Sequence, residues 1–160
     1  MAKELAIFGG SFNPIHLGHL IIAECCLEQA HLDRVLFMPA ATPPHKQNSP
    51  LACPEDRIEM LRLALASHDK LDFSLNECDR GGISYTVDTV SNLVARHPND
   101  RFSLILGPDA LRDLPSWRKP QEILGIVRIL AIERHGIDDI EKTLQEPQLK
   151  ALLSNKQSQQ

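Results

Sequence analysis

Short apolar runs alternate with longer amphipathic stretches along this chain. Apolar runs that stop at Gly or Pro are typical of strands buried inside a parallel sheet. Between them lie stretches with apolar side chains at helical spacing. The pattern predicts strands over 5–8, 35–38, 71–75, 102–106 and 127–132, and helices over 18–30, 54–67, 84–97, 120–124 and part of 142–160.

This alternation of strands and helices predicts βαβ units and therefore an α/β fold. We expect a Rossmann-like, mostly parallel sheet of about five strands with helices on both faces. Sheets of this kind bind ligands beyond the carboxyl ends of their strands. That rule places Gly9 and Gly10, the Pro-rich loop over 40–52 and the segment 107–109 along one edge.

The composition is that of an ordinary globular chain. It has 160 residues, of which 42% are hydrophobic and 24% charged, enough for a full hydrophobic core. The net charge of −4 argues against a nucleic-acid partner, which would need a basic surface. No apolar stretch approaches the roughly 20 residues of a membrane span. Four cysteines without a CxxC pair, and a start without a secretory leader, predict reduced thiols and a cytoplasmic protein.

The end of the chain is more polar than the rest. We expect one main domain over 1–136, followed over 137–160 by a C-terminal helix and a polar tail. Two charged residues on predicted helices, Arg57 and Asp88, are interpreted by default as surface charges of their helices. A ligand contact is the alternative for each.

The segment 9–19, Gly-Gly-Ser-Phe-Asn-Pro-Ile-His-Leu-Gly-His, joins the first predicted strand to the first predicted helix. Paired glycines allow a tight turn and a close approach to a ligand. A helix that begins near Gly18 presents free N–H groups and the positive end of its dipole, which suits a phosphate. His16 and His19, three residues apart on one side of the first turn, can donate hydrogen bonds to phosphoryl oxygens and stabilise a charged transition state.

Other interpretations of this segment are possible. It contains neither a Walker loop nor a dinucleotide fingerprint. The alternative to a phosphate site is a glycine turn with two incidental histidines at a helix start. A zinc site is disfavoured because the local sequence positions no third ligand. The combination of a strand, paired glycines, HxGH and a helix favours phosphate binding.

The segment resembles the HxGH nucleotidyltransferases, and among them most closely the bacterial nicotinate-nucleotide adenylyltransferases. The resemblance covers about residues 3–136. It implies adenylyl transfer from ATP to nicotinate mononucleotide, which yields nicotinate adenine dinucleotide and pyrophosphate in NAD biosynthesis. It further implies that Mg²⁺ arrives with ATP and takes no ligand from the protein. The ATP-binding residues it implies are Gly9, Gly10, Ser11, Phe12, His16, Gly18, His19, Gly107, Asp109 and Arg134.

Two further motifs concern the acceptor nucleotide. The Pro-Pro-His-Lys segment over 43–46 resembles the family's phosphate-contacting loop, so the resemblance implies a catalytic and substrate-binding role for Lys46, beside His16 and His19. The alternative for this lysine is a solvated surface charge. Ser84-Tyr85-Thr86 resembles an element that helps to form the pyridine nucleotide pocket. A plain N-cap at Ser84 is the alternative, and both can be true.

The strand over 102–106 is followed by Gly107 and Asp109, and Trp117 comes eight residues after the aspartate. This resembles the family's GxDxxxxxxxW pattern, which implies that Asp109 faces the adenosine side and that Trp117 stacks near the pyridine ring. A tryptophan packed in the core is the alternative. Arg134 matches the family's Arg-x-Gly and is either a phosphate contact or a surface charge.

The chain departs from the family pattern near its C-terminus. The family carries a second phosphate motif, ISSTxIR or close to it, and this sequence has no such string. Three explanations for the missing motif stay open: the motif lies in a segment outside this sequence, a different clamp holds the phosphates, or most of the catalysis has been lost. The alternatives in function are the same chemistry on nicotinamide mononucleotide or phosphopantetheine, and a catalytically impaired nucleotide-binding regulatory protein.

Overall fold

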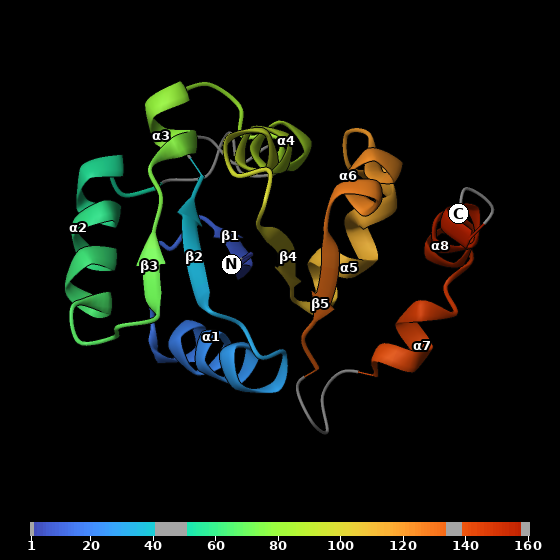
Figure 1. Cartoon of the computed structure of the whole chain (residues 1–160), viewed down its shortest axis with the longest axis horizontal. Helices are drawn as coiled ribbons and strands as arrows, with labels where there is room; N and C mark the ends of the chain where they lie inside the picture. The colour runs from blue at the N-terminus through green and yellow to red at the C-terminus, as the bar shows by residue number, and fades with distance from the viewer. Residues whose placement is uncertain (1, 41–50, 134–138, 158–160) are drawn as a thin grey trace.

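The computed structural model describes residues 2–40, 51–133 and 139–157. Within these residues, five parallel strands form one sheet in the order β3-β2-β1-β4-β5 (Figure 1). This confirms the expected Rossmann-like α/β fold. The strands are β1 (Glu4–Gly10), β2 (Arg34–Pro39), β3 (Leu71–Phe73), β4 (Arg101–Leu106) and β5 (Arg128–Ala131).

The predicted helices are present with shifted ends. The described residues include three short helices that the pattern did not predict, α3 (Asn76–Arg80), α5 (Pro108–Asp113) and α7 (Ile140–Leu144), the last because one C-terminal helix was expected and two are present. A helix of this length shows too little of the apolar period to be recognised from sequence. The other helical segments are α1 (Leu17–Gln29), α2 (Pro54–Leu65), α4 (Thr86–Arg96), the 3₁₀ turn η2 (Leu114–Ser116), α6 (Pro120–Ile126) and α8 (Pro147–Gln157).

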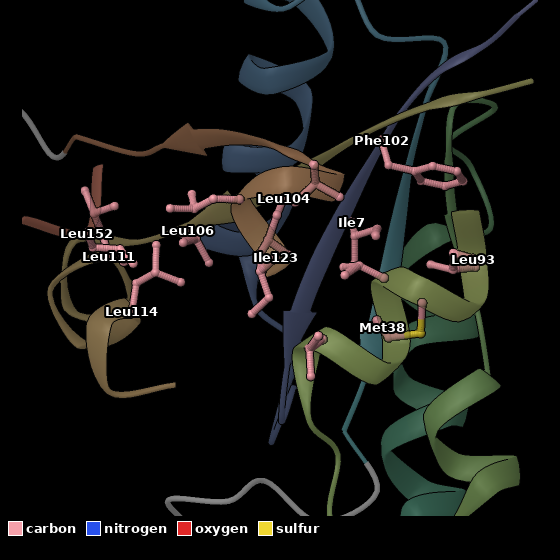
Figure 2. Packing of buried hydrophobic residues seen from close by; sticks show 14 of the residues in the cluster. Ile7, Met38, Leu93, Phe102, Leu104, Leu106, Leu111, Leu114, Ile123 and Leu152 are labelled. Atoms are coloured by element: carbon pink, nitrogen blue, oxygen red, sulfur yellow. The ribbon is translucent and has the colours of Figure 1, made fainter. Parts of the chain in front are cut away.

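Strand β1 lies in the middle of the sheet and has both faces covered. Its side chains alternate, so that Ile7 belongs to the core cluster under α4 and α6, and Phe8 to the cluster under α1 and α2. Burial on both faces explains why the strand is continuously apolar in sequence. Figure 2 shows the first cluster, where leucines of β4, α5 and α8 lie near Ile123 of α6.

The C-terminal helices pack onto this core. Leu149 and Leu152 of α8 are 1% and 5% exposed and belong to the same cluster as Ile123. Helix α8 contacts α6 and η2. The division of the chain at residue 136 stays a prediction. None of the described helices is long and apolar enough to cross a membrane.

The strand order places a crevice at one edge of the sheet. β1 pairs with β2 on one side and with β4 on the other. The chain therefore winds away from β1 in opposite directions, and the space beyond the carboxyl ends of β1 and β4 is left open, as in other doubly wound sheets. Gly10 ends β1, and Gly107 follows β4 at the same edge.

Truncation of Leu149 tests whether α8 belongs to the folded core. We expect Leu149→Ala to lower the free energy of unfolding by about 3 kcal/mol, the usual cost of truncating a buried leucine. The matched control is Leu63→Ala on α2, where the side chain is 62% exposed, and it should cost less than about 0.5 kcal/mol. Urea unfolding of the whole chain measures both. Equal, small effects would show that α8 contributes nothing to the core.

Candidate active site

The loop that joins β1 to α1 is anchored by a buried aromatic ring. Phe12 is 2% exposed, and its ring centroid lies 5.4 Å from that of Phe37 and 5.1 Å from that of His19. Its backbone φ of 44° is left-handed, which is unusual for a bulky residue. Burial of the ring offsets this strain. A Cβ at Gly10 would lie 3.1 Å from the Phe12 ring, so glycine permits this close approach.

The two histidines of the HxGH motif stack on each other where α1 begins. Their ring centroids are 3.7 Å apart, and the ring planes are inclined by 24°. The backbone N–H of His16 donates to Nδ1 of His19 at 3.2 Å. Nδ1 of His19 is therefore the unprotonated nitrogen of the neutral ring, and Nε2 carries the proton. His19 thus retains one ring N–H for a ligand.

The environment of His19 keeps its ring neutral. Burial, followed by the neighbouring charge of His16, lowers the pKa of His19 from its ordinary value of 6.5 to about 4. At neutral pH the ring is a hydrogen-bond donor without a net charge. Its Nε2–H can donate to a phosphoryl oxygen as a neutral donor, so His19 itself adds no positive charge to the phosphate site.

Gly18 is required by the position of the His16 ring. A Cβ on this residue would lie 3.1 Å from both Cε1 and Nδ1 of His16. A side chain at this position would require the His16 ring to shift by a few tenths of an ångström. The glycine of HxGH therefore serves the packing of the two rings.

Arg57 is not the surface charge that the sequence suggested, because only 1% of it is exposed. Its Nη1 donates to the carbonyl oxygens of Ser11 and Ala40, each at 2.9 Å, and its Nε donates to that of Ala52 at 3.3 Å. The Arg57 guanidinium therefore connects three segments: Ser11 after β1, Ala40 after β2, and Ala52, which lies two residues before α2 begins. Sequence patterns do not reveal this role, since the partners are backbone carbonyls far apart along the chain.

The loop that joins β1 to α1 forms one wall of a cavity of about 600 Å³, called cavity A here, which lies at the β1–β4 crevice. The opposite wall is the start of α5, including Asp109, whose side chain is exposed and lies 3.3 Å from Nη1 of Arg112. Most of the residues predicted to bind ATP line cavity A. These are Gly10, Ser11, Phe12, His16, His19, Gly107 and Asp109.

Two smaller cavities continue the groove. Cavity B, of about 220 Å³, shares Gly10, Ser11 and Gly107 with cavity A and is also lined by Gly9. Cavity C, of about 150 Å³, shares Ser84, Thr86 and Trp117 with cavity B. The groove therefore runs from the histidine pair, which the resemblance assigned to the ATP phosphates, to the segment 84–86 and Trp117, which it assigned to the pyridine nucleotide.

Cavity C contains a cationic group, Arg118, beside the predicted residues Ser84, Tyr85, Thr86 and Trp117. The guanidinium carbon of Arg118 lies 4.8 Å from the ring centroid of Tyr85, and Nη1 of Arg118 lies 3.7 Å from Asp88. Sequence reasoning overlooked Arg118, although it directly follows Trp117. Asp88 is about half exposed, in agreement with its interpretation as a surface charge.

The start of α4 differs slightly from the expectation. Ser84 was predicted as the N-cap, but the N-cap residue is Tyr85 and the helix begins at Thr86. The reason is the extended backbone of Tyr85, with φ −92° and ψ 129°. Ser84 is buried and lines cavities B and C. Its position therefore supports a place in the groove wall.

Two predicted residues lie outside the described part of the chain. They are Lys46, with the rest of the segment 43–46, and Arg134. Their predicted roles stay predictions.

No three His, Cys, Asp or Glu side chains of the described residues are grouped as metal ligands. Asp109 in cavity A is a single exposed carboxylate. Because Mg²⁺ keeps several waters and binds readily to substrate phosphates, it does not require a protein cage.

Comparison with known proteins agrees with the fold and the groove. The family model described as cytidylyltransferase-like matches residues 7–156. The doubly wound sheet and the HxGH loop define a nucleotidyltransferase, and the chain belongs to the cytidylyltransferase-like family.

Within this family the chain belongs with the nicotinate-nucleotide adenylyltransferases. The enzyme of that name from Bacillus subtilis (strain 168) is 45% identical over 134 residues, which cover 84% of this chain and 71% of the relative. Two structures of Plasmodium falciparum nicotinic acid mononucleotide adenylyltransferase, one complexed with NaAD and one with APC, align with TM-scores of 0.75 and 0.71. Each is 20% identical and covers 89% of this chain, while the chain covers 70% and 69% of the two structures. At that identity the likeness supports the fold.

The lowered pKa of His19 predicts a pH dependence of stability. Because the folded pKa is about 4 against an ordinary 6.5, the unfolded chain binds more protons between these pH values. The free energy of unfolding should therefore fall as the pH drops through this window. We expect His19→Asn, which can still accept a hydrogen bond from the His16 backbone, to lose less stability over the same window.

Urea unfolding at several pH values measures this difference. The control is His97→Asn, because this side chain is half exposed at the far end of α4. If the free energy of unfolding of His19→Asn depended on pH in the same way as that of the wild type, the neutral state assigned to His19 would be contradicted.

Proposed function

We propose that the chain transfers the adenylyl group of ATP to nicotinate mononucleotide and so forms nicotinate adenine dinucleotide and pyrophosphate. The observation that carries the proposal is the continuous groove, with the histidine pair in cavity A and with Tyr85 and Trp117 in cavity C. The relative from Bacillus subtilis is named for this reaction. A regulatory protein with an impaired site is not favoured, because the stacked histidines and the groove are intact.

The phosphate end performs the transfer. A 5′-phosphate oxygen of nicotinate mononucleotide attacks the α-phosphorus of ATP in line, and the bond from that phosphorus to pyrophosphate breaks. His16 and His19 bind the ATP phosphates and stabilise the charge that builds up on their oxygens. The N-terminus of α1 adds its dipole, and Lys46 and Arg134 supply further positive charge. No covalent intermediate is needed, because positioning and charge stabilisation do most of the work.

The pyridine end selects the acceptor. The Trp117 and Tyr85 rings provide flat surfaces for the pyridine ring, and the start of α4 provides backbone N–H groups for a carboxylate. Arg118 adds a positive charge in cavity C. Asp88, 3.7 Å from Nη1 of Arg118, offsets part of this charge, and the remaining guanidinium N–H donors favour the acid, nicotinate, over its neutral amide. The adenosine part occupies the other end, beside Asp109.

The remaining features of the proposal concern the metal and the place of action. Mg²⁺, brought by ATP, would neutralise the triphosphate, with no ligand required from the described residues. Residues 1–136 would form the nucleotidyltransferase domain. We propose a cytoplasmic enzyme that works on small, soluble substrates.

Pyrophosphate release tests the reaction directly. With ATP and Mg²⁺ present, we expect release to depend on nicotinate mononucleotide and to be at least about 10-fold slower with nicotinamide mononucleotide, since the amide lacks the charge that the cationic pocket binds. Phosphopantetheine serves as a second acceptor in the same assay. Release that is fastest with either alternative would identify a sister activity, and nucleotide binding without any release would refute the enzyme.

Replacement of His19 tests the catalytic assignment. Loss of a donor to a transition-state oxygen typically reduces kcat by about 10²–10³-fold, so we expect a loss of that size for His19→Ala. His97→Ala is the control and should retain wild-type turnover. Steady-state kinetics at saturating concentrations of both substrates measures both variants. Full turnover by His19→Ala would show that this histidine is not catalytic.

A further inference from the structure

A buried carboxylate lies in the groove between the two ends of the proposed dinucleotide. Glu77 of α3 is 7% exposed and lines cavity B. Among the described residues, it is the one charged side chain in that lining. A carboxylate is rarely placed at such depth without partners, because desolvation of the charge is costly.

One partner comes from the protein. The Thr89 hydroxyl donates to Oε1 of Glu77 at 2.6 Å. An ionised carboxylate offers about four acceptor positions, so this bond leaves acceptor capacity unused. In the described part of the chain, no fully buried side-chain oxygen lacks a hydrogen-bond partner. Because Glu77 lines cavity B, a ligand in that cavity can reach the acceptor positions that Thr89 leaves unused.

The sign of the charge restricts the ligand group that can occupy cavity B. A buried anion repels phosphates and carboxylates, and it favours neutral hydroxyl donors or a cation. The anionic groups of the acceptor therefore belong elsewhere: the phosphate beside His16 and His19 in cavity A, and the ring carboxylate beside Arg118 in cavity C. The part that joins these two groups is the ribose, which carries two hydroxyl donors.

We propose that the Glu77 carboxylate, held by Thr89, binds a ribose hydroxyl of the pyridine mononucleotide. This inference rests on the proposed function, since it takes the acceptor to be a ribonucleotide. The hydrogen bond fixes the sugar between the ring and the phosphate. It thereby directs the 5′-phosphate toward the histidine pair and gives the site a preference for ribose over deoxyribose.

The test combines substrate analogues with a variant. Wild-type protein and Glu77→Gln are each assayed with nicotinate mononucleotide and with its 2′-deoxy and 3′-deoxy forms. In the variant the one amide oxygen is taken by Thr89, so no carboxylate acceptor remains for the sugar. We expect the wild type to lose about 10–100-fold in kcat/KM with one of the deoxy forms, a span typical of a lost hydrogen bond to a charged group. Glu77→Gln should show a similar loss with the natural substrate and little further loss with that deoxy form.

Two additional variants separate binding from a structural role. Thr89→Val removes the hydroxyl but keeps the carboxylate, so it should still discriminate against the deoxy form. Glu28→Gln is the matched control on the exposed surface of α1 and should behave like the wild type. The KM for ATP should change little in Glu77→Gln, whereas a collapse of the groove would raise the KM for both substrates.

The outcomes also distinguish this inference from the proposed function. A wild type without activity on nicotinate mononucleotide would refute the function itself. An active wild type that uses both deoxy forms as well as the ribonucleotide would overturn the role of Glu77, whether or not the variant folds. The role of Glu77 would also be overturned if Glu77→Gln still discriminated against the deoxy forms as strongly as the wild type. A variant that changed the Mg²⁺ requirement and left this discrimination intact would overturn it as well.

Discussion

Strand β1 is hydrogen-bonded in parallel to β2 along one edge and to β4 along the other. This double pairing brings the end of β1 and the residues after β4 to one crevice. The HxGH loop follows the first strand directly, and α5 follows the fourth. Both walls of cavity A therefore result from strand order, and the two buried faces of β1 hold the crevice rigid. The β1–α1 loop needs such a support because its own turn contains Phe12 with a left-handed φ of 44°.

The groove separates charges along its length. In the proposed binding mode, His19 provides a neutral donor for the phosphate, Glu77 an anion beside the ribose, and Arg118 a cation beside the ring. A nucleotide that carries a phosphate, a sugar and an acidic ring matches this order of charges in a single orientation. The arrangement therefore contributes to orientation as well as affinity, because the reversed pose places like charges together.

Sequence patterns were sufficient for the elements that follow simple rules. Apolar runs predicted the central strands β1, β2 and β4, since a parallel sheet covered on both faces demands them, and the more mixed segments 71–75 and 127–132 gave the two edge strands of the described sheet. The paired glycines and the spacing of the two histidines predicted a phosphate loop, because adjacent residues at a strand-to-helix junction meet without help from the rest of the fold. The short helices α3 and α5 escaped notice, as did the exact start of α4, since local preference is weak over so few residues.

Contacts between distant segments could not be derived in this way. Arg57 resembled a surface charge until folding brought three carbonyls around it, and Glu77 had no distinguishing motif until α3 was placed beside α4. Likewise, nothing local indicated that Arg118 shares a cavity with Tyr85. The amino-acid order thus specified the α/β class and the chemistry of the HxGH loop, because both depend on neighbours in the chain. The continuity of the groove and its order of charges arose from packing between segments far apart in sequence, which local preferences do not encode.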